Sequence, residues 1–248
     1  MESEKPKNKN VFFVGLLSFF GGISQDIFTP ILPIYLTTVL GFDKAFVGIA
    51  EGVVAASSNL FKVIAGFFSD KFKKQKPIIF IGYFLSMISR PFLAFFTSGA
   101  AVIGLRLADG TGKGIKDPPK DVLIAGSAKK ENRGKSFGIA RILDTLGSVV
   151  GPLLLFLLLY IFKGVNLVYH YIFVFAVVPL LITLLVLVWK VKEVDGPREA
   201  AIETKVEKTP LPRSFYIFLT IVILFTLGNS SDAFLILRAR SLGVTLLE

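Results

Sequence analysis

Seven long apolar stretches constrain the fold of this chain more than any other feature. They cover residues 12–40, 45–68, 77–96, 100–127, 136–161, 167–189 and 214–237. Each is close to or above the roughly 20 residues that an α-helix needs to cross a bilayer core. Backbone groups in lipid must be hydrogen-bonded within their own segment, so these stretches predict spanning helices. With 53% apolar and 19% charged residues, the fold class expected is an all-α polytopic membrane protein.

Lys and Arg gather on alternate connections between these stretches. The basic connections are the N-terminal tail and the second, fourth and sixth, with Lys5, Lys7, Lys9, Lys71, Lys73, Lys74, Lys76, Lys129, Lys130, Arg133, Lys135, Lys190, Lys192, Arg198, Lys205, Lys208 and Arg213. The first, third and fifth connections carry only Lys44 and Lys163. This asymmetry predicts a cytoplasmic N-terminus in a cell membrane and argues against a nucleic-acid partner for the net charge of +10. Arg238 and Arg240 lie on the unexpected side.

The sequence predicts four parts. Residues 1–10 form a cytoplasmic tail, 11–189 a six-helix bundle of two three-helix repeats, and 190–213 a linker that contains Pro197, Pro210 and Pro212. Residues 214–248 are expected to begin a second, incomplete bundle, so the chain reads as a truncated product. A short natural protein is the alternative.

The sequence has few of the residues that usually bind metal ions or form disulfides. There is no Cys and a single His, so neither a disulfide framework nor a site of several Cys or His ligands is available. No cofactor is expected.

Charged side chains inside the spans are the candidate functional residues, because one at a helix centre costs about 2.5–3.5 kcal/mol even on the mild insertion scale. In the fourth span they fall on one face of the helix, within an arc of roughly 140°. Such a stripe predicts a helix that lines an aqueous path, with pairs Arg106–Asp109, Asp109–Lys113 and Asp117–Lys120 along it. The candidates are Asp26, Glu51, Arg90, Arg106, Asp109, Lys113, Lys116, Asp117, Lys120, Arg141 and Asp144, with Gln25, Asp121 and Asp232 nearby.

The expected depth in the membrane divides these candidates into two groups. Asp26, Glu51, Arg90 and Arg106 are expected toward the outer half of their spans, and Arg141 and Asp144 at the inner level of residues 116–120. A buried carboxylate beside a cation is a candidate proton carrier, so Asp26, Glu51 and Asp109 are the hypotheses. The alternative is that these charges only hold the bundle together.

Two prolines in the fourth span predict a broken helix. Pro118 and Pro119 each remove a backbone donor, which frees the carbonyls of Gly114 and Ile115. Broken helices near the middle of the bilayer often form substrate or ion sites in transporters.

The connection between the second and third spans resembles a known signature. Gly66, Asp70, Lys71 and Lys74 match the major facilitator loop G-x-L-a-D-R-x-G-R-[RK], with Phe68 and Lys73 as departures. In that family this loop gates the cytoplasmic side. The resemblance implies that Arg133, on the next cytoplasmic loop, is its partner.

Two helix signatures point to the same family. Arg106 to Gly110 resembles the fourth-helix R-x-x-x-G motif, which implies proton coupling. Gly147, Gly151 and Pro152 resemble the fifth-helix G-x-x-x-G-P motif of antiporters, although the later glycines of that motif are leucines here. Close helix packing through small residues is the alternative for these glycines.

The run Arg106–Ala125, with Ser89-Arg90-Pro91 and Asp144-Thr-Leu-Gly147, is similar to a prokaryotic group of major facilitator efflux proteins with twelve spans. The resemblance implies alternating-access, proton-coupled export of a small organic solute. The expected partners are membrane lipid, that solute, protons and a second bundle.

The fourth span lacks residues that two enzyme motifs require. Gly110 to Gly114 lacks the first glycine and the Ser or Thr of a phosphate-binding loop and follows no strand. A CDP-alcohol phosphotransferase would need an Ala-Arg pair where Gly112, Lys113 and Gly114 stand. An enzyme is therefore not expected; a non-transporting membrane partner protein is the remaining alternative.

Overall fold

The computed structural model describes residues 5–72, 74–163, 167–194, 211–228 and 231–244, with side chains left out at 5–8, 70–72 and 227. The first half contains α1 (Lys5–Phe28), α2 (Leu32–Thr38), α3 (Lys44–Phe72), α4 (Gln75–Phe92) and α5 (Gly99–Ser127). After the short 3-10 turn η1 (Lys130–Asn132) come α6 (Arg133–Ile161), α7 (Val168–Phe175), α8 (Val177–Trp189), α9 (Arg213–Gly228) and α10 (Asp232–Ser241). The described part is helical and without strands, as the apolar stretches predict.

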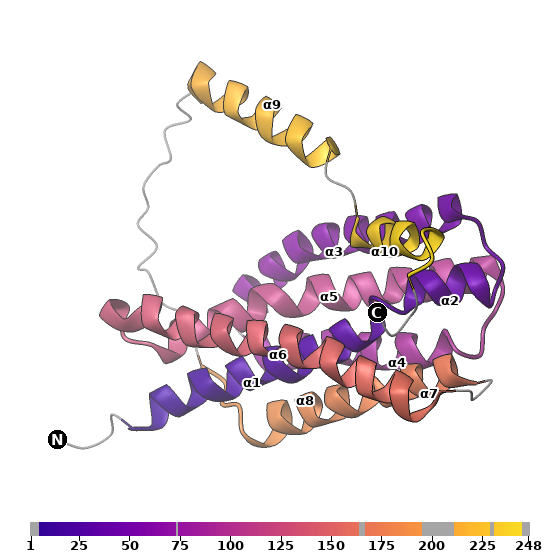
Figure 1. The fold of residues 1–248 in the computed structure, drawn as a ribbon. Coiled ribbons are helices and arrows are strands. Elements are labelled where there is room, and N and C mark those ends of the chain that lie inside the picture. The colour runs from indigo at the N-terminus through magenta and orange to yellow at the C-terminus, as the bar shows by residue number, and fades with distance from the viewer. Residues whose placement is uncertain (1–4, 73, 164–166, 195–210, 229–230, 245–248) are drawn as a thin grey trace.

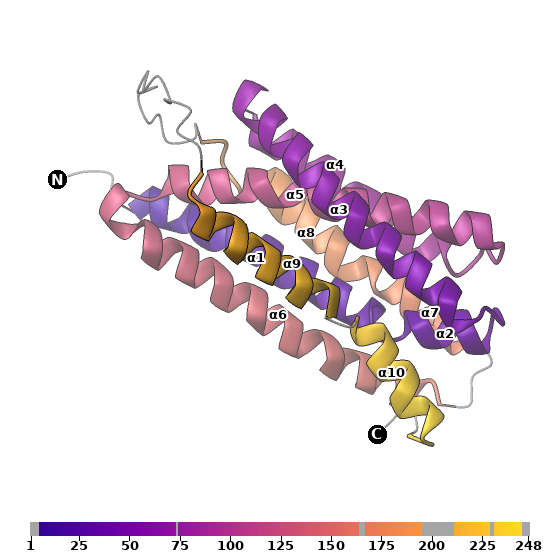
Figure 2. The same cartoon turned by 90° about the horizontal axis from the view of Figure 1, so that it is seen from above.

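Four helical segments of the described chain are long and apolar enough to cross a membrane by length and composition. They are Lys9–Thr38, Lys44–Ser69, Lys130–Ile161 and Val168–Trp189. The fourth and third expected spans, α5 and α4, pack lengthwise among them (Figures 1 and 2), and α5 carries the charged stripe. Segment Arg213–Thr226 of α9 is apolar but shorter.

The packing of the first eight helices has the symmetry of a repeated unit. The main pairs are α1 with α6, α3 with α5, α4 with α5, α1 with α8, and α4 with α8. Exchanging α1 with α5, α3 with α6, and α4 with α8 maps this set of pairs onto itself. The observed pairs therefore have the pattern that two three-helix repeats produce.

The predicted interruption at Asp117-Pro118-Pro119 is wrong, because α5 runs as one helix from Gly99 to Ser127 with both prolines inside it. Each proline removes only one backbone bond. Helices α3 and α4 pack along α5 and support the remaining ladder. Pro152 likewise lies inside a continuous α6.

The first and sixth spans divide instead. Three residues, Thr29 to Ile31, separate α1 from α2, and Pro33 lies in the first turn of α2, where its missing N–H costs nothing. Ala176 separates α7 from α8, and its carbonyl accepts a hydrogen bond from Ser24 Oγ at 2.5 Å.

The single helix predicted over 214–237 is also wrong, because the structure has two helices there. Ser231 caps α10, since its hydroxyl accepts from the backbone N–H of Ala233 at 3.3 Å. Ser is a preferred N-cap residue, so it favours a new helix start inside the apolar stretch. Helix α10 packs on α2 and α3, while the described side chains of α9 from Arg213 to Thr226 are all exposed, and Figure 1 shows α9 standing away from the bundle.

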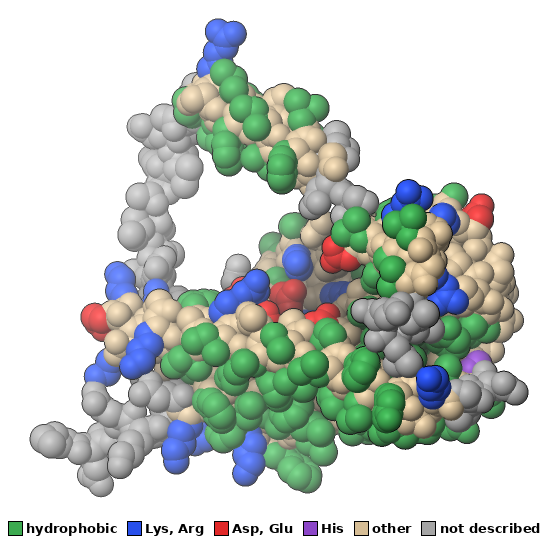
Figure 3. Space-filling model, viewed as in Figure 1, with side chains coloured by type: hydrophobic (Ala, Val, Ile, Leu, Met, Phe, Trp, Pro, Cys, Tyr) green, Lys and Arg blue, Asp and Glu red, His purple; other side chains and the backbone are tan. Residues whose placement is uncertain are grey.

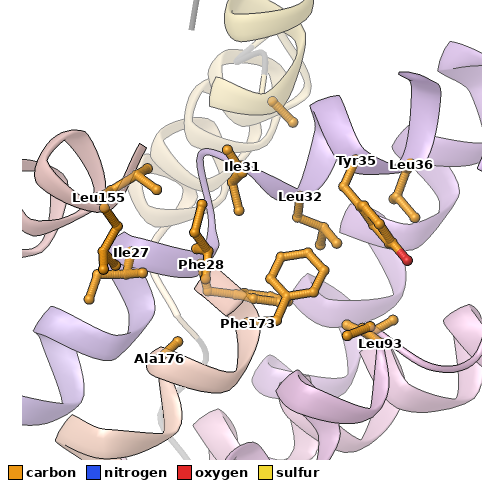
Figure 4. Close-up of a cluster of buried hydrophobic side chains, with 14 of the residues drawn as sticks. Ile27, Phe28, Ile31, Leu32, Tyr35, Leu36, Leu93, Leu155, Phe173 and Ala176 are labelled. Atoms are coloured by element: carbon orange, nitrogen blue, oxygen red, sulfur yellow. The ribbon is translucent and has the colours of Figure 1, made fainter. Parts of the chain in front are cut away.

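Two apolar cores hold the bundle. The larger lies where α1, α2, α7 and the end of α4 meet (Figure 4), and Phe173 packs on Phe28 and Tyr35 with ring centroids 5.2 and 5.0 Å apart. The smaller core joins α1, α4, α5 and α8 nearer the basic end. The charged site lies between them.

Polar contacts join the helices at the basic end of the bundle. Asn10 Nδ2 donates to Ser127 Oγ at 2.7 Å, and Asn10 Oδ1 accepts from the backbone N–H of Lys192 at 2.8 Å. The Glu193 carboxylate accepts from the first backbone N–H groups of α4, at 2.6 Å from Gln75 and 3.1 Å from the next residue. The starts of α1 and α4 therefore meet the ends of α5 and α8 at one end.

Candidate functional site

A cavity of about 1040 Å³ lies between α1, α3, α4, α5 and α6. Figure 3 shows a hollow on this face, with acidic and basic side chains gathered inside it. Its charged lining consists of Asp26, Lys62, Lys113, Lys116, Asp117, Lys120, Asp121, Arg141 and Asp144. Gln25, Ser18, Ser148, Tyr83 and Phe137 also line it, so the cavity offers both signs of charge, hydroxyl groups and aromatic surface.

Glycines let α5 approach its neighbours closely. A side chain at Gly110 or Gly114 would collide with the backbone of α3, and one at Gly112 would place its Cβ 2.5 Å from the carbonyl oxygen of Gly82 in α4. The three glycines therefore fix α5 as the centre of the α3–α5–α4 layer, with its charged stripe at the cavity.

Gly147 and Gly151 pack α6 against α1. A Cβ at Gly151 would lie 2.8 Å from Asp26 Cβ and 3.0 Å from the carbonyl oxygen of Ile23, and one at Gly147 would lie 3.1 Å from Phe19 Cα. This geometry is the close packing that small residues allow between membrane helices. A role of these glycines in antiport stays a prediction.

Asp109 is the centre of a buried ion cluster. Its Oδ1 lies 3.2 Å from Arg90 Nε, and its Oδ2 lies 3.6 Å from Arg106 and 3.7 Å from Lys113. Arg106 also donates to Glu51 at 2.6 Å. Arg90, Arg106 and Asp109 have at most 1% of their surface exposed. We call these five residues the Asp109 cluster; three cations face two carboxylates.

The cluster reaches three further helices through Arg90. Its guanidinium donates to Ser24 Oγ at 2.5 Å and to Gln25 Oε1 at 2.7 Å, and Ser24 in turn donates to the Ala176 carbonyl. The Phe28 ring lies 5.6 Å from the Arg90 guanidinium carbon. Arg90 thus links α4 to α1 and to the junction of α7 and α8, and Lys113 is the member of the cluster that lines the cavity.

A second set of pairs lies toward the basic end. Asp117 contacts Lys120 at 3.3 Å and Lys62 at 3.8 Å, and Lys120 also donates to Ser18 Oγ at 3.1 Å. In α6, Arg141 pairs with Asp144 at 3.1 Å. All three pairs expected along the fourth span are present. Each also has a partner from another helix, because Arg90 of α4 contacts Asp109 in two of the pairs and Lys62 of α3 contacts Asp117 in the third.

Two of the predicted residues lie in the cavity without an ion pair. Neither Asp26 nor Lys116 has an opposite charge within 4.0 Å among the described side chains. Asp26 is half-buried on α1, whereas Lys116 is only 9% exposed and its Nζ lies 4.7 Å from the centre of the Tyr83 ring.

The predicted gating loop is only partly within the described chain. Gly66 is half-buried in α3, and Lys74 is exposed just before α4. The side chains of Asp70 and Lys71 lie outside the described residues. Arg133 begins α6, and its pairing with the loop stays a prediction.

Sequence reasoning missed several residues of the site, three of which make contacts that shape it. Lys62 and Tyr83 line the cavity, and Ser24 bridges Arg90 to the Ala176 carbonyl. A lone lysine within the second apolar stretch was a signal for Lys62. Tyr83 and Ser24 carry no such signal, because both are ordinary residues in membrane helices.

A helical bundle that exposes apolar side chains on its outside and surrounds a charged cavity is typical of membrane transport proteins. The sequence profile of the Major Facilitator Superfamily matches residues 14–247, so the chain belongs to that superfamily. An uncharacterized MFS-type transporter of Methanocaldococcus jannaschii is 33% identical over 240 residues, which is 96% of this chain and 58% of that protein. The multidrug resistance protein MdtH of Aeromonas hydrophila is 28% identical over 151 residues, 61% of this chain and 38% of that protein.

Solved transporter structures share the fold. Tetrameric PepTSo2 aligns with a TM-score of 0.68 at 16% identity, over 93% of this chain and 49% of that one. A bacterial homolog of the human lysosomal transporter Spinster, inward-facing and unoccupied, aligns with a TM-score of 0.65 at 18% identity, over 88% of this chain and 50% of that one. The chain therefore spans about half of these structures. Its family is one of transporters and not of enzymes, and the phosphotransferase alternative is dropped.

Proposed function

We propose that this chain forms the N-terminal half of a secondary active transporter that exports a small organic solute across the cell membrane by alternating access. The observation that carries the proposal is the cavity of about 1040 Å³, lined by charges of both signs within an otherwise apolar bundle. Charges in membrane helices are costly and mark substrate and ion pathways. The names of MdtH and of the quinolone resistance protein NorA of Staphylococcus aureus, 27% identical over 145 residues, support export.

The cytoplasmic side is proposed to be the basic end of the bundle. The lysines at that end include Lys9 near the start of α1, Lys130 just before α6, and Lys190 and Lys192 just after α8. Cytoplasmic loops carry an excess of Lys and Arg, so this placement supports a cytoplasmic N-terminus.

The second wall of the substrate path is proposed to come from another six-helix bundle. Substrate sites in this type of transporter lie at the interface between two such halves, which rock against each other. The cavity is open on the face seen in Figure 3, and the chain spans 58% of its archaeal relative. The 248 residues alone are therefore expected not to transport.

Asp26 is proposed as the proton carrier. Of the three carboxylates considered from the sequence, Glu51 and Asp109 are tied to arginines at 2.6 and 3.2 Å, so protonating either would break an ion pair. Asp26 is half-buried at the cavity and has no cation within 4.0 Å among the described residues. Protonating Asp26 breaks no ion pair, which favours reversible proton binding.

The test uses proteoliposomes that hold this chain together with the C-terminal half of the Methanocaldococcus jannaschii relative, loaded with fluorescent dyes of either charge. An imposed proton gradient should drive saturable dye movement, and Asp26→Asn should remove the dependence on the gradient. Asp43→Asn is the matched control, because Asp43 caps α3 outside the cavity and Asn caps equally well.

Saturable proton-driven transport by the 248 residues alone would contradict the need for a second bundle. Unchanged coupling in Asp26→Asn would remove Asp26 from the proton path. If the assembled halves move no solute under any gradient, the transporter proposal itself fails.

A further inference from the structure

The charges of the cavity are almost completely paired with one another. Five Lys and Arg side chains line it, and four of them have a carboxylate within 4.0 Å: Lys62, Lys113, Lys120 and Arg141. The exception among the described residues is Lys116. A ligand would have to break an ion pair to bind any of the other four cations.

Lys116 is held in place although its charge is unpaired. Its stem packs against Gly82, where an added Cβ would lie 2.9 Å from Lys116 Cβ. Its Nζ lies 4.7 Å from the centre of the Tyr83 ring, and Tyr83 is fixed because its hydroxyl donates to the Leu17 carbonyl at 2.9 Å. A contact with an aromatic face offsets only part of the cost of burying an ammonium group. The site therefore lacks an anion.

The carboxylates of the cavity show the complementary exception. Asp117 and Asp144 are bound to cations at 3.3 and 3.1 Å. Among the described residues, Asp121 also has no cation within 4.0 Å, but its side chain is exposed near the end of α5. Asp26 is therefore the half-buried carboxylate of the cavity that has no cation partner among the described residues.

The two unpaired groups line the same cavity from different helices, Asp26 from α1 and Lys116 from α5. Tyr83, which carries Lys116 on its ring, also packs on α1, where a Cβ at Gly21 would lie 2.9 Å from the Tyr83 ring. A cavity of about 1040 Å³ has room for one small molecule that contacts both α1 and α5.

We propose that the cavity selects an amphoteric solute, whose acidic group pairs with Lys116 and whose amino group pairs with Asp26. This inference rests on the proposed function, because it names the class of solute that the transporter carries. An aromatic or aliphatic spacer between the two charges would lie against the Tyr83 ring.

The test measures binding to the purified 248-residue chain in nanodiscs of phosphatidylcholine, by calorimetry. The probes are 4-(aminomethyl)benzoate, which carries both charges, and its singly charged matches 4-methylbenzoate and 4-methylbenzylammonium. The doubly charged probe should bind at least about tenfold more tightly than either match, the gain expected from one further charge-assisted hydrogen bond.

The variants separate the two charges. Lys116→Gln should weaken the binding of 4-(aminomethyl)benzoate and 4-methylbenzoate about tenfold without weakening that of 4-methylbenzylammonium. Asp26→Asn should weaken the binding of 4-(aminomethyl)benzoate and 4-methylbenzylammonium about tenfold without weakening that of 4-methylbenzoate. Lys116→Arg keeps the charge and should keep the preference, which shows that position 116 tolerates substitution. Lys44→Gln, on the surface at the start of α3, is the control.

Several results would overturn the inference. The first is equal affinity of the chain for the three probes, and the second is no binding at up to about 10 mM. The third is a loss of affinity in Lys62→Gln, which removes a paired charge from the same cavity, as large as the loss in Lys116→Gln. Competition by added phosphatidylglycerol would assign Lys116 to a lipid headgroup. Because binding is measured without transport, failed transport with intact binding contradicts only the proposed function.

Discussion

Replacing Asp109 by Asn tests whether the Asp109 cluster is a fixed structural centre. The substitution keeps the size and shape of the side chain and removes its charge. Arg90, Arg106 and Lys113 then remain, with Glu51 as their one nearby carboxylate, and three cations are left buried against one anion.

The expected loss follows from the distances. At an effective dielectric constant of about 20, each of the three contacts of Asp109, at 3.2 to 3.7 Å, contributes about 4.5–5 kcal/mol of attraction. The burial cost of the carboxylate and the contact that Arg106 keeps with Glu51 offset much of this attraction. Removing one partner from a buried pair typically costs about 3–5 kcal/mol.

Thermal unfolding of the purified chain in detergent measures this loss. For chains of about this size 1 kcal/mol shifts the midpoint by about 2–4 °C, so Asp109→Asn should lower it by about 6–20 °C. Asp43→Asn makes the same chemical change at a surface cap and should shift it by less than about 2 °C. If Asp109→Asn unfolds within about 2 °C of the parent, the reasoning that this carboxylate neutralises the arginines is refuted.

Two further substitutions probe the helix contacts. Glu193→Gln removes the charge that accepts from the first two N–H groups of α4, and it should cost about 1–2 kcal/mol in the same unfolding assay; a loss below about 0.3 kcal/mol would show that the contact is solvated. Gly151→Ala places a methyl group 2.8 Å from Asp26 Cβ and should cost about 1–3 kcal/mol. Its control Gly138→Ala, on the same helix with nothing within 4 Å, should stabilise by up to about 1 kcal/mol, and equal effects at both positions would contradict close packing of α6 on α1.

Hydropathy predicted where the helices lie but not where they bend. Both sides of a bend are equally apolar, so the hydropathy of the stretch 12–40 does not show that α1 ends at Phe28 and α2 begins at Leu32. The prolines of α5 predicted a helix break that is absent, whereas the prolines near Thr29 would have predicted the break between α1 and α2 correctly. The outcome depends on the neighbours: α5 is packed along its length by α3 and α4, whereas Pro33 is placed where a new helix can start.

The charged stripe predicted the pairs within α5 but not the pairs between helices. Periodicity places Arg106 next to Asp109, yet the shortest contact of Arg106 is with Glu51 of α3, at 2.6 Å. Likewise Arg90 reaches Asp109 from α4, at 3.2 Å. Which charge remains unpaired depends on these tertiary partners, so the exceptional position of Lys116 could not be read from the stripe.

Asp26 and Lys116 would also determine whether the proton and the solute move in opposite directions or in the same direction. A proton and the amino group of a solute would compete for Asp26, so loading one would release the other, which is the relation that exchange of proton for solute requires. The acidic group of the solute would meet no such competitor at Lys116. A solute with an acidic group alone would instead bind better when Asp26 is protonated, because the cavity then gains a positive charge, and it would move with the proton rather than against it. An amphoteric solute is therefore the class that reconciles an unpaired lysine in the cavity with the proposed export driven by proton entry.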